Sequence, residues 1–532
     1  MPSGLNSRRP VAIIGAGPIG LTAALGLAHH GIPFVIYEDD DRLSLDTKAG
    51  TTLSRTLEVW RRFGVADEIL QVALRADEIG EVDRATSRPP FPVRLHELGA
   101  ETRYPFVVNL PQHHMEPVLA AAVNRVAPDS FRLQHRLVNL TQNEAGATLT
   151  FDTPQGPLTV QADHVLGCDG GQSTVRHLLG FTADGTSFPE RYALIDLVID
   201  LDVENPRDFP YLAYFSDATE WIILVRQPHC WRFLFPAPEA EGDPTDEMLR
   251  DKALSFIGGV VASDATIINK VLYRTHHRTA NRWRDRGVFL MGDAAHLITP
   301  MWALGLNTGV LDASNLPWRL AWVLRGWADD RLLDGYEAEQ RPIAANGTGE
   351  MSQAARAYMA KRAEGVQAMT VNNWSNACTR AMLGVCLDVS GGGGGSMVKS
   401  ETEPALVVGD RMPDMLIHTP EGREIRLHDL CDDRFVALWF TDARRRPPVP
   451  PHRSPALVHY VVSRWDAPTD GGLRDRALLD AGDRLKNRIK VAPDTLVLVR
   501  PDEHVAAIVP MGPGVAEALY RNITGRPVPE AA

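Results

Sequence analysis

The sequence predicts an α/β protein: a nucleotide-binding domain with an antiparallel β-sheet domain inserted into it, and a further C-terminal domain. A βαβ pattern with three spaced glycines opens the chain at residues 10–38. A β-rich block follows at 192–235, and a strand-then-helix pattern returns at 287–321. A glycine run at 391–396 then marks the start of the last domain, because it has no side chains to bury.

Composition limits the class of protein. A chain of 532 residues predicts roughly three or four domains. Its apolar share of 44% and charged share of 23% are ordinary for a globular protein. The net charge of -12 argues against nucleic acid or an anionic membrane as the main partner. We find neither a signal peptide before the first strand nor a run of about 18 apolar residues that would span a membrane.

The cysteines predict a reducing compartment. They are odd in number and scattered, and no two of them form a CxxC pair. This pattern argues against a disulfide framework and a zinc site, so we expect a cytoplasmic protein without a metal centre. The cysteines are Cys168, Cys230, Cys378, Cys386 and Cys431.

The pattern of apolar and turn-forming residues along the chain predicts secondary structure and domain limits. We expect a helix at 112–126, a hairpin at 131–141 and 147–151, a strand at 158–166 and an antiparallel sheet with one wet face at 192–235. Two C-terminal strands are expected at 435–440 and 495–499. The expected nucleotide-binding domain comprises residues 1–190 and 276–345, of which 78–110 contribute to the substrate domain at 191–275. A helical segment at 346–390 and a flexible linker at 391–398, whose composition is typical of an engineered one, come before the last domain at 399–532.

The first motif, VAIIGAGPIG, places GxGxxG between a strand and a helix. Gly15 permits the tight turn, Gly17 lets the backbone approach a pyrophosphate, and Gly20 allows close packing of helix and strand. Glu38 ends the next strand, where a carboxylate accepts both ribose hydroxyls. This pattern favours the ADP half of FAD or NAD over NADP. A glycine turn without a ligand is the alternative.

A second motif distinguishes FAD from NAD. The strand GVFLM delivers Asp293 to its carboxyl end, where ligands bind in open α/β sheets. The polyol chain of a flavin is a good partner for that carboxylate, although Asp293 could instead cap a loop. Pro300 and Gly305 then bring the chain to a helix that begins near Leu306 and Asn307, whose amides favour negative charge on a reduced flavin.

With GAGPIG at 15–20, CDGGQSTVR at 168–176 and GDAAHLITP followed by GLNTGVLDASNLPWRLA at 292–321, the chain resembles the FAD-dependent aromatic hydroxylases. These are single-component flavoprotein monooxygenases of the p-hydroxybenzoate hydroxylase fold. The closer resemblance is to phenol or hydroxyphenylpropionate hydroxylase-like members with a thioredoxin-like C-terminal domain. The resemblance covers residues 10–345 well and the remainder more loosely.

The resemblance implies a set of site residues. The pyrophosphate turn would be Gly15, Gly17, Pro18, Ile19 and Gly20, with Glu38 at the ribose, Lys48 or Arg55 nearby, Gln112 on the flavin chain, and Asp293, Pro300, Gly305, Leu306 and Asn307 around the ribityl and pyrimidine parts. Asp169 would serve FAD and nicotinamide binding or, alternatively, pair with Arg176 in a strand-end turn.

Catalytic and substrate residues are weaker predictions. Candidates that help deprotonate a phenol are Tyr211, Tyr214, His229, Arg232 and His296, and each also has a bland interpretation as a packed or solvated residue. Met301 and Trp302 stand where the family has a Gly-Gly-Gln-Gly type of run, so they either line the substrate pocket with Tyr214 or pack in the core. His113 and His114 are expected to point to different faces and make no metal pair.

Two further departures from the family carry expectations. Pro317 lies in the helix where alanine is common, which predicts a kink or an early turn. The C-terminal domain lacks CxxC, so we expect no redox exchange there and a structural or oligomerisation role, the latter as a homodimer.

The resemblance implies a reaction. NAD(P)H would reduce FAD, O₂ would add to give a C4a-hydroperoxide, and a phenolic or other aromatic small molecule would be hydroxylated. An FAD-dependent dehydrogenase or reductase and a non-catalytic interaction protein are the alternatives. The substrate, and the choice between NADH and NADPH, are not encoded in any motif that the sequence contains.

Overall fold

The computed structural model describes residues 9–44, 50–83, 93–199, 201, 209–216, 221–237, 242–257, 265–352, 382–390, 396–397, 405–431, 433–441, 449, 454–464 and 474–530. Within these ranges, no helix is both long and apolar enough to cross a membrane.

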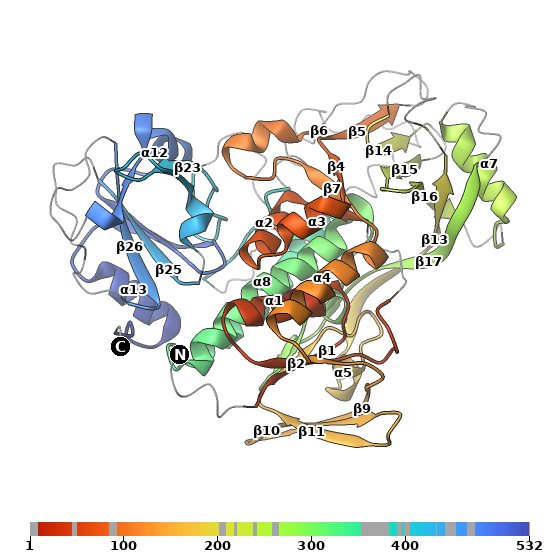
Figure 1. Cartoon of the computed structure of the whole chain (residues 1–532), viewed down its shortest axis with the longest axis horizontal. Coiled ribbons are helices and arrows are strands. Elements are labelled where there is room, and N and C mark those ends of the chain that lie inside the picture. The colour runs from red at the N-terminus through yellow and green to blue at the C-terminus, as the bar shows by residue number, and fades with distance from the viewer. Residues whose placement is uncertain are drawn as a thin grey trace.

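Strand β1 (Val11–Ile14), which precedes the glycine motif, lies inside a six-stranded sheet (Figure 1). Its two neighbours, β12 and β2, run parallel to it, and β19 is parallel to β12. The carboxyl ends of these strands therefore meet at one edge, although the strands are far apart in the sequence. The sheet order is β18 (Arg284–Asp285), β19 (Val288–Leu290), β12 (Val165–Gly167), β1, β2 (Phe34–Tyr37) and β8 (Phe131–Arg132).

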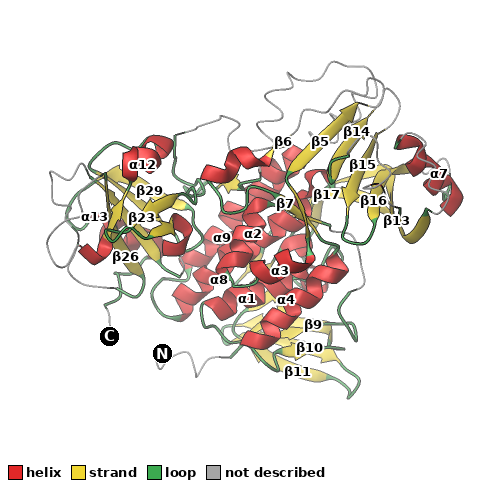
Figure 2. Cartoon of the chain, turned by 45° about the horizontal axis from the view of Figure 1, so that its top comes forward, coloured by secondary structure: helices red, strands yellow, loops and turns green. Residues whose placement is uncertain are grey.

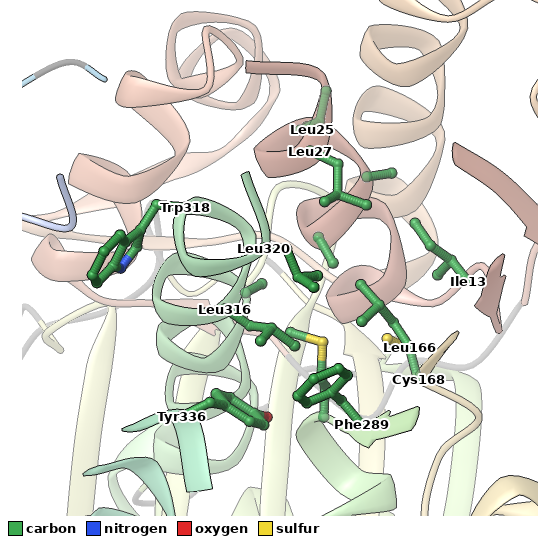
Figure 3. Close-up of a cluster of buried hydrophobic side chains, with 14 of the residues drawn as sticks. Ile13, Leu25, Leu27, Leu166, Cys168, Phe289, Leu316, Trp318, Leu320 and Tyr336 are labelled. Atoms are coloured by element: carbon green, nitrogen blue, oxygen red, sulfur yellow. The ribbon is translucent and has the colours of Figure 1, made fainter. Parts of the chain in front are cut away.

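Helices pack on this sheet through an apolar core (Figure 3). Their bounds are α1 (Pro18–His29), α2 (Ser54–Arg62), α3 (Ala66–Val72), α4 (Gln112–Val126), α5 (Thr174–Leu178), α8 (Leu304–Leu324) and α9 (Arg331–Pro342). Side chains of α1 and α8, such as Leu25 and Leu316, meet strand residues such as Ile13 and Phe289 in that core. The predicted helix 112–126 is confirmed.

Helices α1 and α8 approach closely where Pro317 faces Gly26. A Cβ on Gly26 would lie 2.9 Å from the Cγ of Pro317, so the missing side chain makes room for the proline ring. The expectation of an early turn at Pro317 is wrong, because α8 continues to Leu324. Packing on α1 compensates for the backbone hydrogen bond that a proline removes.

The inserted domain is an eight-stranded, largely antiparallel sheet. Its order is β20 (His296–Leu297), β17 (Thr266–Ala280), β13 (Ala183–Val198), β16 (Trp231–Ala237), β15 (Trp221–Arg226), β14 (Leu212–Ser216), β5 (Glu78–Asp83) and β6 (Val93–Arg94). The expectation of one wet face is wrong. Tyr214 and Leu234 pack on one face, and Phe215 and Phe233 pack on the other beneath α7 (Asp246–Phe256).

Two smaller sheets adjoin the nucleotide domain. The predicted hairpin is confirmed as β9 (Arg136–Asn143) and β10 (Gly146–Asp152). The strand expected at 158–166 is divided into β11 (Leu158–Ala162) and β12, because the chain leaves the three-stranded sheet for the six-stranded one. The other small sheet has the order β3 (Thr51–Thr52), β7 (Val107–Asn109) and β4 (Leu74–Ala76).

The C-terminal domain holds a seven-stranded mixed sheet, and both predicted strands are confirmed in it. Figure 2 shows this sheet and the inserted sheet on opposite sides of the central helices. The order is β24 (Glu424–Arg426), β23 (Leu416–His418), β27 (Ala477–Leu479), β26 (Leu457–Ser463), β25 (Phe435–Phe440), β28 (Thr495–Val499) and β29 (Val505–Pro510), with helices α12 (Arg484–Ile489) and α13 (Val515–Thr524). The thioredoxin-like assignment and the domain limits stay predictions.

The chain around the glycine run returns on itself. Strand β21 (Val385–Cys386) pairs antiparallel with β22 (Ser396–Met397), which includes the serine of GGGGGS. The five glycines, 391–395, lie outside the described residues.

The C-terminal domain contacts the rest of the chain through buried charges. Burial raises the pKa of Glu58, but Arg411 of the C-terminal domain and its other cationic neighbours outweigh burial and lower that pKa from 4.5 to about 2. Burial likewise opposes the charged form of Glu339, and the nearby guanidinium of Arg319 helps lower its pKa to about 2. Both carboxylates stay charged in the folded protein because cations surround them.

We expect acid to weaken this docking. Because both pKa values are lower in the folded than in the unfolded chain, the stability they contribute is present above pH 4.5 and is lost as the pH falls from 4.5 toward 2. The urea midpoint, followed by tryptophan fluorescence, should fall across that window. Glu58→Gln should flatten the dependence, and a wild-type midpoint that does not change there would contradict the assignment.

Candidate functional site

The loop between β1 and α1 is a tight glycine turn. Gly15 has a φ of +104°, and a Cβ there would lie 2.5 Å from the carbonyl oxygen of Cys168. A Cβ on Gly20 would lie 2.1 Å from the carbonyl oxygen of Gly15, so glycine is needed for α1 to begin this close to the strand. By contrast, nothing lies within 4 Å of the Cβ position of Gly17. The turn therefore has open space at the N-terminus of α1, where amides and the helix dipole favour a phosphate.

The carboxylate of Glu38 lies beside this turn. Its Oε2 accepts a hydrogen bond of 2.6 Å from the backbone amide of Ala16, and its Oε1 accepts one of 3.2 Å from that of Asp40. The side chain is half-buried, and a carboxylate has more acceptor positions than these two amides use. Glu38 is thus held where a ribose bound at the turn would present its hydroxyls.

Asp293 lies at the same edge of the sheet, after β19. A Cβ on the preceding Gly292 would lie 2.8 Å from the Cγ1 of Ile19, and a Cβ on Gly309 of α8 would lie 2.7 Å from its Cδ1. The start of α1, the loop of Asp293 and α8 therefore meet around Ile19, a meeting that we call the Ile19 junction. Asp293 is exposed there. The structure brings together two motifs from opposite ends of the nucleotide domain.

The start of α8 is tied to the chain that leads into α2. The Oδ1 of Asn307 accepts from the amide of Leu53 at 2.9 Å and from the hydroxyl of Thr56 at 2.6 Å. Its Nδ2 donates to the carbonyl oxygens of Thr51 at 3.1 Å and Ala303 at 2.7 Å. The side chain is thereby saturated, which leaves the main chain here for a ligand. The other residues predicted around this point, all half-buried, are Pro300, Gly305 and Leu306.

The other three predicted cofactor residues are Gln112, Lys48 and Arg55. Gln112 begins α4, and its Nε2 donates to Glu116 at 2.7 Å. Lys48 lies outside the described residues. Arg55 is buried in α2 and pairs with Glu503 of the C-terminal domain. The structure places Arg55 in an interdomain contact instead of at the glycine turn, because the carboxylates that compensate its buried charge lie on that side.

The segment from Asp169 to Arg176 contacts the Asp293 loop. The hydroxyl of Ser173 donates to Asp169 at 2.5 Å, and this hydrogen bond opposes the larger effect of burial, which raises the pKa of Asp169. Arg176 donates to the carbonyl oxygens of Ala294 at 2.9 Å and Gly171 at 2.8 Å. These contacts replace the predicted pairing of Arg176 with Asp169, and they fasten the chain directly after Asp293.

Asp312 is a site residue that the sequence reasoning missed. Its Oδ2 lies 2.8 Å from the Nε2 of His296, with both side chains fully buried, and accepts from the amide of Gly292 at 2.9 Å. Trp283 stacks on the His296 ring at 5.2 Å between centroids. His296, predicted as a catalytic candidate, is thus a buried support of the Asp293 loop. An aspartate inside an apolar helix was the available signal, since a buried carboxylate needs partners.

Trp302 and Tyr214 form an aromatic wall between the α8 start and the inserted sheet. Their ring centroids are 4.9 Å apart with planes tilted by 23°, and both side chains are buried with Met301 in one apolar cluster. Trp302 has φ 61° and ψ 18°, and Ala303 also has a positive φ. This left-handed backbone costs about 1–3 kcal/mol at a non-glycine residue, so packing must hold it in place. Trp302 is thus packed in the core, one of the two predicted alternatives, where it faces Tyr214; its part in a substrate pocket stays a prediction.

Two other catalytic candidates have side-chain partners of their own. Tyr211 packs edge-on against Trp231, with centroids 6.1 Å apart. Arg232 pairs with Asp196 of the neighbouring strand at 2.8 Å, and both are buried, so its charge is already balanced. Tyr214 is the predicted candidate that stacks on Trp302, directly before α8 begins.

Two histidines at the start of α4, which lie near His229 of the loop between β15 and β16, correct another expectation. The rings of His113 and His114 lie 4.2 Å apart, so they do not point to different faces. His229, an exposed catalytic candidate, lies 5.6 Å from His114. Burial and then the neighbouring His229 lower the pKa of His114.

A cleft of about 1100 Å³ lies elsewhere, between β17 and α9. Its lining includes Arg284, which pairs with Asp330 and Asp334 at 2.5 Å each. None of the residues at the Ile19 junction lines it, so we do not assign it to the candidate site.

Comparisons with known proteins bear on the same region. A family model described as FAD binding domain matches residues 8–349. A 3-(3-hydroxy-phenyl)propionate/3-hydroxycinnamic acid hydroxylase of Mycolicibacterium smegmatis is 33% identical over 345 residues, which are 63% of this chain and 58% of that relative. Para-nitrophenol 4-monooxygenase of a Pseudomonas species is 27% identical over 337 residues, 63% of this chain and 83% of the relative. The match spans less than two thirds of the first relative.

A solved structure shares the fold over nearly the whole chain. The flavin-dependent monooxygenase PieE, in complex with FAD and substrate, superposes with a TM-score of 0.78 at 24% identity, covering 98% of this chain and 99% of that one. At this identity the likeness shows the fold alone. Together with the family model and the relatives, it confirms the resemblance to FAD-dependent aromatic hydroxylases.

Two glycine variants should separate binding from folding. Gly17→Ala is expected to keep the urea midpoint, because its φ of -70° suits alanine and its Cβ meets open space, yet to weaken FAD binding roughly tenfold or more by filling the pyrophosphate's approach. Gly20→Ala should instead destabilise the fold, because its Cβ meets the backbone. Fluorescence titration with FAD measures the first effect. Wild-type affinity in Gly17→Ala would refute the placement.

Proposed function

Because the chain belongs to the FAD binding domain family, we propose that it is an FAD-dependent monooxygenase that hydroxylates a phenolic or other aromatic small molecule, using NAD(P)H and O₂. The observation that carries the proposal is the Ile19 junction. It brings open space at Gly17 and the exposed carboxylate of Asp293 to one sheet edge. The aromatic wall of Trp302 and Tyr214 follows directly where α8 begins.

The residues present fit FAD along its length. The open N-terminus of α1 at Gly17 suits the pyrophosphate, and Glu38 suits the adenosine ribose. Asp293 suits the ribityl hydroxyls, since an exposed carboxylate accepts hydrogen bonds from a polyol. The chemistry that bound FAD supplies in such a site is electron transfer from a reduced nicotinamide to dioxygen, so that one oxygen atom enters an aromatic ring.

The protein's own residues position the ligand, exclude water from the site and polarise it. The amides at the start of α8 favour negative charge on a ligand placed against them, and Asn307 keeps that start in place. Met301 and Trp302 are buried beside it and exclude water, which strengthens electrostatic interactions at the site. Tyr214 presents its ring to the same region, and an aromatic substrate packs well on such a surface.

The relatives support the substrate class. One is named for hydroxyphenylpropionate and hydroxycinnamic acid, and the other for para-nitrophenol. Each of these compounds has a hydroxyl group on an aromatic ring. A phenolate is a better nucleophile than a phenol, so a group that withdraws the phenol proton would assist. Tyr214 is the predicted residue best placed for this role. The predicted cytoplasmic location, the homodimer and the nicotinamide partner stay predictions.

We expect the purified protein to bind FAD and to show substrate-dependent oxygen incorporation. NADH or NADPH oxidation and O₂ uptake should rise with a phenolic compound, and a reaction under ¹⁸O₂ should give a product that carries one labelled oxygen by mass spectrometry. Oxidation without label in the product would favour the dehydrogenase or reductase instead. A protein without affinity for FAD would refute both enzymes and favour a non-catalytic role.

The aromatic wall gives a prediction of its own. Trp302→Leu removes the ring that stacks on Tyr214, whereas Trp302→Phe keeps an aromatic ring there. With stacking worth about 0.5–1.5 kcal/mol, we expect the substrate KM of Trp302→Leu to rise roughly two- to tenfold and that of Trp302→Phe to change less. Equal FAD content in all three proteins is the control. An unchanged KM in Trp302→Leu would remove Trp302 from the substrate site.

A further inference from the structure

Helix α2 buries a charged face. Arg55, Glu58 and Arg62 lie three and seven residues apart, so they share one side of the helix, and their side chains are only 2–3% exposed. Charged side chains are almost never this buried unless they are paired. The opposite face carries Trp60, whose Nε1 donates to Thr22 of α1 at 3.1 Å. Helix α2 is therefore enclosed on both sides.

The turn between β28 and β29 of the C-terminal domain supplies the partners. We call residues 501–503 the acidic turn. Glu503 pairs with Arg55 and lies 3.3 Å from the Nη1 of Arg62, so one carboxylate binds both ends of α2. The carbonyl oxygens of Asp502 and Pro501 accept from Arg55 at 2.9 Å and Arg62 at 3.2 Å. Glu503 has a φ of +66°, a left-handed backbone that is held by these contacts.

The same turn also binds α8. The Oδ2 of Asp502 accepts from the Nε1 of Trp318 at 3.1 Å and from the Nδ2 of Asn315 at 3.3 Å. Arg62 adds a direct link, because its Nη2 donates to the hydroxyl of Ser314 at 2.6 Å. The acidic turn thus lies between α2 and α8 and fixes the distance between them.

A second tie joins the two helices at the cofactor side. Asn307, at the start of α8, holds Leu53 and Thr56, at the start of α2, as described above. Arg55 stands between these two residues in the sequence and is bound by Glu503. The start of α2 is therefore gripped by the acidic turn on one side and by Asn307 on the other.

From this double tie we infer that Asp502 and Glu503 are positioning residues for the flavin site: Glu503 acts through Arg55 and α2, and Asp502 acts through Trp318 and Asn315 of α8, to set the start of α8 at Asn307. The inference rests on the proposed function for its ligand. Neither residue touches the cofactor side, and both act through helices that do. The C-terminal domain is then a part of the flavin site's framework, which gives a role to a domain that has no CxxC.

The physical reason is charge compensation. Neutralising Glu503 would leave Arg55 and Arg62 buried with less negative charge, which is strongly unfavourable unless α2 moves toward water. Because Leu53 and Thr56 are hydrogen-bonded to Asn307, such a movement would pull on the start of α8. Packed helices shift as units, so a change at the acidic turn reaches the cofactor side.

The first experiment needs no flavin. Amide hydrogen exchange is measured on the flavin-free full chain for wild type, Glu503→Gln and Asn307→Ala. We expect both variants to speed exchange in residues 51–57 and 304–309. The matched control is Arg526→Gln, which breaks a partly exposed link between the same two parts of the chain, 2.6 Å from Asp329. Faster exchange confined to residues 58–62 and 500–505 in Glu503→Gln would overturn the inference.

The second experiment measures the flavin. FAD affinity of Glu503→Gln should fall roughly five- to tenfold, within the range of ordinary coupling between sites, and the visible band of the bound flavin should shift. Glu503→Asp, which keeps the charge, should restore both, and Arg526→Gln should match wild type. In combination with Asn307→Ala, the loss from Glu503→Gln should be less than additive, since both act on the same tie. Additive losses, or unchanged affinity and spectrum, would overturn the inference.

The two arms separate the possible failures. Wild-type protein without FAD affinity refutes the proposed function, while the exchange arm still decides whether the acidic turn is coupled to Asn307. If Glu503→Gln does not fold, Asp502→Asn tests the same coupling through Trp318 and Asn315, because it leaves the Glu503 charge on α2. Exchange in residues 304–309 that equals wild type in a folded Asp502→Asn would then overturn the inference.

Discussion

The structure depends on the close approach of α1 to α8 and to the Asp293 loop. Ile19 touches the positions where Gly292 and Gly309 lack side chains, and Gly26 makes room for Pro317 further along the same helix. Each contact brings backbone to within van der Waals distance, which a side chain at any of these glycines would prevent. Because α1 is fixed in this way, its open N-terminus, the Asp293 loop and α8 have one mutual arrangement. The candidate site is a consequence of that arrangement.

A second constraint is the treatment of buried charge. His296 and Asp312 are fully buried beneath the Asp293 loop, and the charged face of α2 is buried against the C-terminal domain. Apolar side chains of the same volume would often be as stable or more so, so stability alone does not explain such groups. What buried polar contacts add is direction: a carboxylate accepts only from donors placed around it. Both clusters lie directly behind elements of the candidate site, where exact direction matters more than it does in a general core.

The sequence predicted the parts of the candidate site that depend on local conformation. The glycine turn, Glu38 and Asp293 were predicted because each follows a strand and its role depends on a few neighbouring residues. Long-range pairing was not accessible in the same way. Arg55 was assigned to the cofactor because nothing near it in the sequence indicates that its partner is Glu503, and Asp312 was overlooked because its partner His296 lies before the helix begins. The wet face of the inserted sheet failed for the same reason: α7 covers it from a separate segment.

Trp302 and Ala303, in the run where the sequence departs from the resembled family, both have positive φ values. Glycines are common in the resembled family at this run, and glycine adopts a left-handed backbone without strain. Here two non-glycine residues, Trp302 and Ala303, adopt this left-handed backbone at the turn into α8. The strain at Trp302 is offset by burial and by the stack on Tyr214. The departure from the resembled family at this run therefore places the ring of Trp302 against Tyr214 of the inserted sheet.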